Sequence, residues 1–418
     1  MSEQKVQNRW WVVVGAILIQ LCLGAIYAWS AFTGILKEAD WSKAETQMVF
    51  SAGLALFAIV MVIAGRMMPR VGPRKLAIGG SVVLGVGYIL AGLIGATSFW
   101  PVFLLIGVVG GAGIGLAYVV PIAVGMRWFP DKKGLITGLA VAGFGFGATL
   151  WVMLAGPWAH LLENIGLGNT FVLYGVIFLV AGSIGGLFMT WPPDGWKPAG
   201  WNPPAPVAGK AMAGSEDFTA GEMLRTPQFY MIFTTFLFGA GAGLMVIGNI
   251  KLFGNQELVA AGLTEEAATA ATSLAMGVFY ALANGLGRIV WGTISDRLGR
   301  KASLVLMTAI QGVMVILFQW MAGTTGLLYL GAALIGFNFG GNFALFPTIT
   351  ADTFGTRNVG ANYGWVFLAY GLGGIIGPIM AGRLGDAGRF SLAFTICGAA
   401  CLVAALIIAL VKPARKAA

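Results

Sequence analysis

Charged side chains are scarce in this sequence. They make up 10% of its 418 residues, whereas soluble domains carry about 25%. Histidine occurs once, and the three cysteines, Cys22, Cys397 and Cys401, lack the spacing of zinc or redox sites. The composition therefore argues against a soluble protein, a disulfide framework and a metal centre, and we predict no cofactor.

Acidic residues are missing from the interior of the apolar blocks. All 16 aspartates and glutamates fall in loops or at block ends, and His160 stands at the end of a block. A proton-coupled carrier usually holds its proton on an embedded carboxylate or histidine, and an enzyme needs clustered nucleophiles, bases or metal ligands. We therefore predict that the protein is not an enzyme, and that a co-transported proton would travel on the substrate.

Hydrophobic residues make up 58% of the sequence and form long continuous blocks. Blocks of about 20 to 27 residues suffice for helices across a hydrocarbon core of roughly 30 Å. Transmembrane strands would alternate instead, and the many glycines inside the blocks favour close helix packing. The sequence predicts an all-α integral membrane protein with twelve spans, near residues 10–36, 46–68, 75–95, 100–127, 135–158, 170–190, 228–253, 267–292, 302–322, 326–350, 360–384 and 388–411.

The basic residues are distributed unevenly between the two sides of these spans. An even number of spans places both termini on one side, and most of the 25 lysines and arginines fall on that side. Cytoplasmic loops carry the excess of positive charge. We therefore expect both termini in the cytoplasm, a multi-pass protein of the inner (plasma) membrane, and no nucleic-acid partner for the net charge of +9.

The chain reads as two related halves. A proline-rich stretch between spans six and seven has the composition of a linker, which predicts a six-helix bundle over 1–190, a cytoplasmic linker over 191–227 and a second six-helix bundle over 228–418. Residues 65–75 resemble residues 292–301, and residues 129–134 have a looser counterpart at 354–360. Parallel six-span repeats enclose a central site near the bilayer midplane, so we expect a monomer to form the whole pathway.

The loop between spans eight and nine carries Asp296-Arg297, followed by Gly299, Arg300 and Lys301. This pattern resembles the signature of the major facilitator superfamily. An acid and several cations at helix ends can bridge two helices and engage helix dipoles when one face of a carrier is closed. We therefore predict a gating role for Asp296, Arg297 and Arg300, and for Arg70 in the matching loop of the first half, with topological charge alone as the alternative.

Arg288 differs from the other cations because it stands inside span eight. No acidic residue lies three or four positions away, and a charge within a membrane span costs roughly 2.5–3.5 kcal/mol on insertion scales. Guanidinium stays protonated, and its planar fork holds both oxygens of a carboxylate. We predict that Arg288 binds an anionic substrate, the alternative being an arginine that reaches the cytoplasmic interface.

Aromatic residues in the spans could complete a binding cage around such an anion. A tyrosine hydroxyl can donate to a carboxylate oxygen, while phenyl rings exclude water and strengthen the arginine contact. Packing against lipid or other helices is the alternative for each residue taken alone. The candidates are Tyr27 on span one, Tyr118 on span four, Phe339 and Phe343 on span ten, and Phe367 and Tyr370 on span eleven.

Several stretches resemble the oxalate/formate exchanger family, a branch of the major facilitators close to the monocarboxylate transporters. These stretches are residues 127–134 (RWFPDKKG), 221–229 (GEMLRTPQF), 284–288 (NGLGR), 344–347 (ALFP) and 362–364 (NYG). The resemblance covers nearly the whole chain and implies that Arg288 binds the substrate carboxylate. It also implies that Tyr27, Tyr118, Phe339, Phe343 and Phe367 line the cavity.

Two departures from that family bear on the substrate. By the resemblance, Tyr370 stands where the oxalate exchanger has a second cation, a lysine, so one cation remains and a monocarboxylate is favoured. Asn284 stands where animal-type monocarboxylate carriers have an aspartate one turn before the arginine. We therefore predict a secondary active transporter of a small monocarboxylate such as lactate, pyruvate, formate or acetate, with oxalate/formate exchange as the alternative. Uniport, exchange for a counter-anion and proton symport remain open.

Overall fold

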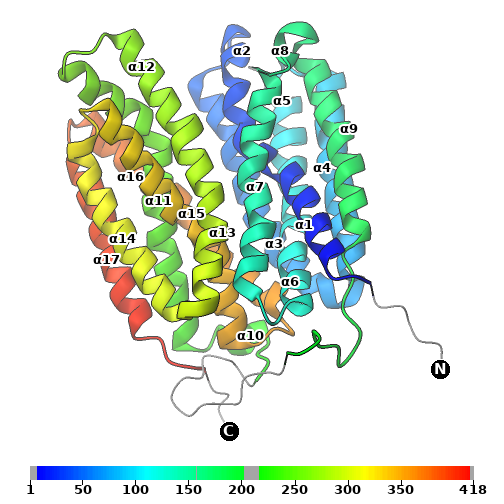
Figure 1. The fold of residues 1–418 in the computed structure, drawn as a ribbon. Helices are drawn as coiled ribbons and strands as arrows, with labels where there is room; N and C mark the ends of the chain where they lie inside the picture. The colour runs from blue at the N-terminus through cyan, green and yellow to red at the C-terminus, as the bar shows by residue number, and fades with distance from the viewer. Residues whose placement is uncertain (1–6, 157, 202–215, 415–418) are drawn as a thin grey trace. The chain divides into compact units, whose positions relative to one another are not determined.

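The computed structural model describes residues 7–156, 158–201 and 216–414. By its internal contacts the chain divides into two compact units. The first comprises Met1–Ala205 together with Asn358–Gly364, and the second comprises Pro206–Arg357 together with Trp365–Ala418. Within each unit the long helices stand side by side and are joined by short loops (Figure 1).

The described part of the chain consists of helices joined by loops and contains no strand. The first unit holds α1 (Trp10–Leu23), η1 (Gly24–Ala31), α2 (Thr33–Glu38), α3 (Lys43–Val71), α4 (Pro73–Gly95), α5 (Phe99–Val102), η2 (Phe103–Gly110), α6 (Gly111–Trp128), α7 (Lys133–Ala155), α8 (Leu161–Asn164) and α9 (Gly166–Leu187). The remaining elements are α10 (Ala220–Met223), α11 (Pro227–Ala260), α12 (Glu265–Leu274), η3 (Ala275–Tyr280), α13 (Ala281–Leu298), α14 (Arg300–Met321), α15 (Thr325–Phe354), α16 (Val359–Asp386) and α17 (Phe390–Ala409).

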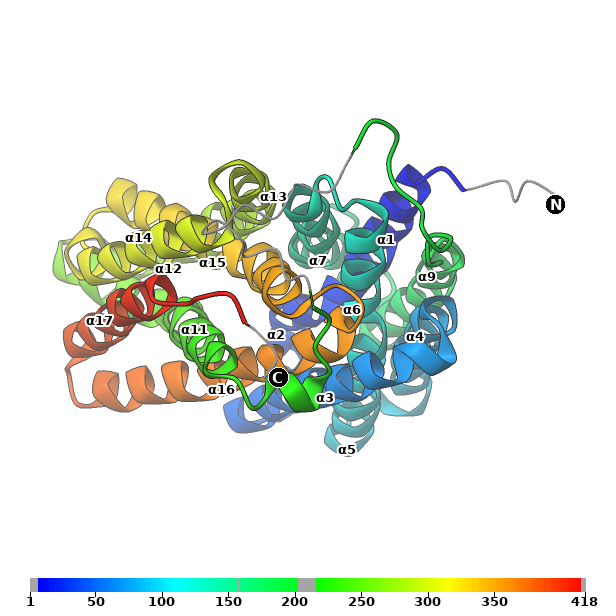
Figure 2. The same cartoon turned by 90° about the horizontal axis from the view of Figure 1, so that it is seen from below.

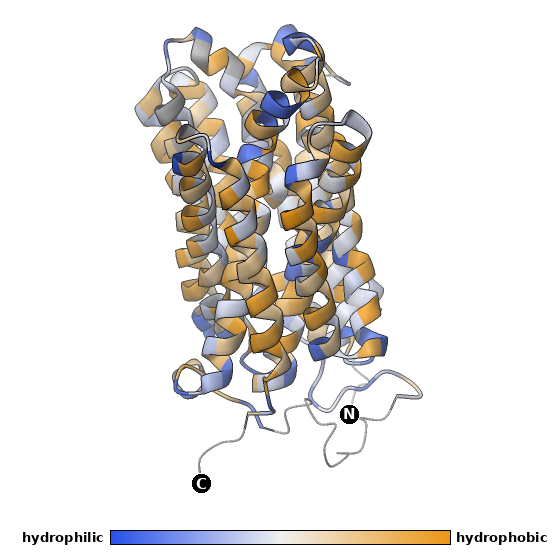
Figure 3. Ribbon diagram, turned by 90° about the vertical axis from the view of Figure 1, so that its left-hand side faces the viewer, coloured by the Kyte–Doolittle hydropathy of each residue, from blue (hydrophilic) through white to orange (hydrophobic). Residues whose placement is uncertain are grey.

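Twelve helices of the described residues are long and apolar enough to cross a membrane, which confirms the predicted number of spans. Large apolar side chains are exposed on these helices, among them Leu93 at 69% and Leu406 at 68%. Exposing such side chains to water is unfavourable, whereas the hydrocarbon core of a membrane accommodates them. Hydrophobic residues run along the helices, and hydrophilic ones collect at the helix ends (Figure 3). The all-α integral membrane fold is therefore confirmed.

The first span is shorter than the sequence predicts. It covers Trp10–Trp29, not 10–36, because α1 gives way at Gly24 to the 3₁₀ helix η1, after which α2 starts as a separate helix. A Cβ at Gly24 would overlap the backbone carbonyl of Phe144 on α7, so η1 approaches α7 closely. An eight-residue 3₁₀ segment is unusually long, and it contains Tyr27.

The two aligned loops of the sequence repeat have the same backbone geometry. Gly72 precedes α4 with φ of 88° and ψ of 151°, and Gly299 precedes α14 with 90° and 152°. Residues with a Cβ rarely adopt this conformation, whereas glycine does so at little cost. The repeat in the sequence is thus a repeat of a turn that requires glycine. Seen from below, α4 lies beside α9, and α14 lies beside α17 (Figure 2).

The described ends of the predicted linker pack on different units. Trp196 meets Trp128 of the first unit edge to face, with ring centroids 4.9 Å apart. On the second unit, the Phe218 amide donates to the Phe354 carbonyl at 2.9 Å, and the Arg357 amide donates to Asp217 Oδ1 at 3.0 Å. The linker is thus tied down at both described ends, and residues 202–215 lie outside the described part of the chain.

Candidate functional site

Arg288 is fully buried on α13. Its Nε donates a hydrogen bond of 3.0 Å to Oδ1 of Asn284, one helical turn earlier. A neutral amide oxygen satisfies this N–H without neutralising the guanidinium charge. The arrangement therefore keeps a positive charge inside the second unit and restrains its orientation.

Glycines bring α13 against α15, the helix that carries the neighbouring aromatic rings. A Cβ at Gly340 would overlap the carbonyl oxygen of Asn284, and a Cβ at Gly287 would overlap that of Phe337. Small residues at such interfaces let membrane helices approach backbone to backbone. The residues flanking Arg288 thus determine its distance from α15.

The guanidinium of Arg288 lies over the ring of Phe343, with Cζ 4.2 Å from the ring centroid. The negative face of an aromatic ring attracts a cation, by about 2 kcal/mol or more when both are desolvated. Phe339 meets Phe343 edge to face at 5.3 Å, and both rings are buried. The cation thus packs against a neutral aromatic surface.

Two residues of α16 extend this group of rings. Tyr370 lies 5.4 Å from Phe343 between ring centroids, and Phe367 lies 5.0 Å from Tyr370. The structure therefore brings together the six residues of the second half that were considered for the anion site. We call them the Arg288 cluster: Asn284, Arg288, Phe339, Phe343, Phe367 and Tyr370.

Phe236 on α11, which was not predicted from the sequence, joins the cluster from a third helix. Its ring centroid lies 6.1 Å from Phe367, 6.4 Å from Tyr370 and 6.5 Å from Phe343. Nothing in the sequence distinguishes Phe236 from the other 26 phenylalanines. Its position depends on the rotation of α11 about its own axis, which only packing decides.

In the first unit, Tyr27 and Tyr118 converge on Phe144 of α7. Both rings meet Phe144 edge to face, at 5.2 Å for Tyr27 and 5.4 Å for Tyr118. Gln20, fully buried on α1, donates to the Tyr118 carbonyl at 3.1 Å. Phe144 and Gln20 were not predicted, although a glutamine in the middle of the first span is a polar residue that the sequence displays.

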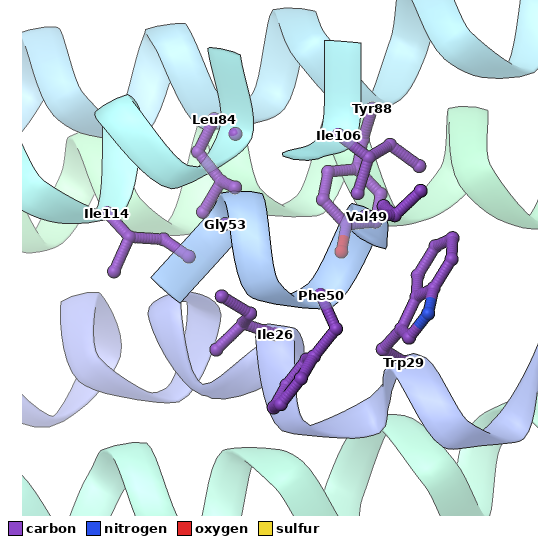
Figure 4. A pocket seen from close by; sticks show the side chains of 10 residues that line it. Ile26, Trp29, Val49, Phe50, Gly53, Leu84, Tyr88, Ile106 and Ile114 are labelled. Atoms are coloured by element: carbon purple, nitrogen blue, oxygen red, sulfur yellow. The ribbon is translucent and has the colours of Figure 1, made fainter. Parts of the chain in front are cut away.

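An apolar pocket also lies in the first unit, among η1, α3, α4, η2 and α6 (Figure 4). Most of its lining is aliphatic or glycine, and Trp29, Phe50 and Tyr88 are its aromatic members. Phe50 also contacts Tyr27, with ring centroids 6.4 Å apart. The lining contains no charged residue, so the pocket offers an anion no counter-charge.

The predicted gating residues have different environments. Arg300 bonds Asp296 at 2.7 Å through Nη2 and Asp352 at 3.1 Å through Nε, so it joins the ends of α13 and α15. Asp352 was not predicted. Arg297 and Arg70 are exposed, and their gating role stays a prediction, as does that of Asp296 and Arg300.

Metal chemistry has little support in the described residues. Across 7–156, 158–201 and 216–414, no three histidine, cysteine, aspartate or glutamate residues form a group that could hold a metal ion. The three cysteines are buried free thiols. The arrangement in the second unit is suited to binding an anion through Arg288, beside a group of aromatic rings.

Comparison with known proteins agrees with this architecture. The Major Facilitator Superfamily matches residues 12–277 and 257–418. Similar proteins include the uncharacterised MFS-type transporter YhjX of Escherichia coli (strain K12), 30% identical over 88% of this chain and 86% of its own. The oxalate:formate antiporter of Oxalobacter formigenes is 28% identical over 97% and 92%, and apicoplast pyruvate carrier 1 of Toxoplasma gondii is 25% identical over 86% and 81%. With matches along its whole length and twelve membrane-spanning helices, the chain belongs to the major facilitator superfamily.

Proposed function

We propose that this protein is a secondary active transporter of small monocarboxylate anions, which it carries by alternating access with Arg288 as the anion anchor. The observation that carries the proposal is the buried guanidinium held between the Asn284 amide oxygen and the Phe343 ring. The planar guanidinium of Arg288 can hold a carboxylate with two parallel hydrogen bonds, in surroundings where water competes little.

The names of similar proteins support a carboxylate over other anions. One is an oxalate:formate antiporter and another is a pyruvate carrier. Their common chemistry is a small organic acid, and an arginine inside the membrane is the group that such acids require. We extend that chemistry to this chain as part of the proposal.

The charge of the Arg288 cluster favours a monocarboxylate over a dicarboxylate. Arg288 is its cation, and Tyr370 stands where the resemblance to the exchanger family places a lysine. The Tyr370 ring lies among phenylalanine rings, where a second carboxylate would lose its hydration without gaining a cation. Oxalate/formate exchange is the second candidate, in which hydroxyl donors such as Tyr370 would replace the lysine.

The remaining parts of the proposal concern topology and coupling. We place the protein in the plasma membrane with both termini in the cytoplasm, because most basic residues flank that side. We propose a monomer, and we retain Tyr27 and Tyr118 as substrate-binding residues on the resemblance. Because the acidic residues stand at span ends, a co-transported proton would be bound to the substrate. Exchange for a counter-anion is the other mode of coupling compatible with this arrangement.

Thermal unfolding of the purified protein with a panel of anions tests the proposal. A ligand that binds the folded state stabilises it, by about 2.7 kcal/mol at a concentration 100 times its Kd. We expect lactate, pyruvate, formate or acetate to raise Tm, and Arg288→Ala to lose this response while remaining folded. The exposed Arg297→Ala is the matched control and should keep it. Stabilisation by oxalate alone would favour the exchanger, and no response to any carboxylate would refute carboxylate binding.

A further inference from the structure

Asn342 is a buried polar residue beside the Arg288 cluster that the sequence analysis did not single out. It precedes Phe343 on α15 and is 1% exposed. Its Nδ2 donates to the Phe339 carbonyl at 3.0 Å. Its Oδ1 is buried and accepts no hydrogen bond from any residue in the described part of the chain.

The orientation of this amide is determined by its surroundings. If the amide were turned over, Oδ1 would face the carbonyl oxygen of Phe339, and two acceptors would oppose each other. The hydrogen bond to Phe339 therefore directs the acceptor away from its own helix. A buried acceptor without a donor costs about 1–3 kcal/mol, so a bound molecule that donates a hydrogen bond to this oxygen would gain affinity.

The acceptor lies in the seam between α15 and α11. A Cβ at Gly239 of α11 would come within 3.1 Å of Asn342 Oδ1, and a Cβ at Gly243, one turn later, would overlap the Phe339 ring. Two glycines of α11 thus accommodate two neighbouring side chains of α15. Arg288 contacts Phe343 from α13, whereas the side chain of Asn342, the residue before Phe343, faces α11.

We propose that Oδ1 of Asn342 accepts a hydrogen bond from a hydroxyl group of the bound carboxylate, and that the preferred substrates are therefore short hydroxy monocarboxylates. This inference rests on the proposed function, since Arg288 must hold the carboxylate. A hydroxy acid supplies the missing donor. An oxo acid or an unsubstituted acid has no donor beyond its carboxyl group, and leaves the Asn342 oxygen unsatisfied.

Competition against uptake of a labelled monocarboxylate in proteoliposomes tests this inference. Lactate and propionate differ in one hydroxyl group, and pyruvate has a carbonyl oxygen in its place. We expect the wild-type protein to prefer lactate by about tenfold over both, the ratio that one hydrogen bond of ordinary strength provides. Equal inhibition by lactate and propionate in the wild-type protein would overturn the inference without any variant.

Asn342→Leu removes the acceptor at similar volume and should reduce the preference to about one, with propionate affinity retained. Asn342→Ser keeps a small acceptor and should retain part of the preference. The matched control is Asn338→Leu, one turn earlier on α15. Asn338 makes the same kind of bond, to the Leu334 carbonyl at 3.0 Å, but its Oδ1 already accepts from Trp291 Nε1 at 3.2 Å. This control should keep the wild-type ratio.

The outcomes separate this inference from the proposed function. If no monocarboxylate inhibits uptake or stabilises the protein, the proposed function fails, and the inference fails with it. If lactate and propionate both bind through Arg288 but without preference, only the role of Asn342 is refuted. If Asn342→Leu weakens both acids equally, Asn342 has a structural role, such as holding an ordered water molecule, and does not select substrates.

Discussion

Oδ1 of Asn284 accepts a hydrogen bond from Nε of Arg288, one turn further along α13, at 3.0 Å. The bond uses the Nε–H of the guanidinium and none of the N–H groups on Nη1 and Nη2. It therefore orients Arg288 while the Nη face remains suited to a carboxylate. Asn284 acts as a positioning residue for the proposed anion site, and this role can be tested.

Replacing Asn284 by alanine should weaken substrate binding. Hydrogen bonds to charged groups contribute about 1.5–3 kcal/mol, so loss of the acceptor should raise the KM for a monocarboxylate at least about tenfold. Asn284→Asp should be more harmful, because a carboxylate one turn from Arg288 competes with the substrate for the same cation. Uptake kinetics in proteoliposomes measure both effects. An unchanged KM in both variants would show that Asn284 does not position Arg288.

Replacing Phe343 by leucine should reduce affinity by removing the ring beneath the guanidinium. The loss should correspond to about 2 kcal/mol for a desolvated cation–π contact, whereas Phe343→Tyr keeps the ring and should bind nearly normally. Thermal unfolding of each variant with and without a saturating carboxylate measures how far the ligand raises Tm, and the two variants are then compared. If leucine and tyrosine behave alike, the ring face contributes nothing to the site.

Adding a methyl group at Gly340 should force α13 and α15 apart. A Cβ there overlaps the Asn284 carbonyl oxygen, and overpacking of this kind costs about 1–3 kcal/mol or more. We expect Gly340→Ala to lower Tm and to impair transport by displacing Arg288 from Phe343. Gly326→Ala, on the same helix, is the control, since a Cβ there meets nothing within 4 Å. Equal stability of the two variants would contradict close packing at Gly340.

Removing Arg300 should destabilise the ends of α13 and α15. Its guanidinium bonds both Asp296 and Asp352, and Arg300→Ala would leave two carboxylates without their shared cation. We expect a loss of about 1.5–3 kcal/mol, only partly restored by lysine, which lacks the planar fork. Thermal unfolding and initial uptake rates measure the effect, with the exposed Arg297→Ala as the control. A larger defect in Arg297→Ala would instead support the predicted gating role of that residue.

Arg288 was accessible from the sequence because an arginine within a span is rare, and the resemblance to the exchanger family implied its aromatic neighbours. An arginine within a span is costly, so Arg288 was conspicuous, and its helical neighbours at fixed spacing followed. Phe339 and Phe343 share a face because they are four residues apart. Asp352, Phe236 and Phe144 were missed because an acid at a helix end and a phenylalanine in a span are common, and nothing in the pattern shows which neighbour they face.

The sequence by itself determined the twelve membrane-spanning segments, the repeat of residues 65–75 at 292–301, and the place of Arg288 inside span eight. Those features follow from the solvent, since a bilayer requires long apolar helices with internally bonded backbones. Only the tertiary structure decided which rings surround Arg288 and which way the Asn342 oxygen points. These depend on the rotation and spacing of each helix, which are set by backbone contacts at glycines such as Gly340 and Gly239 and not by the periodicity of any one segment.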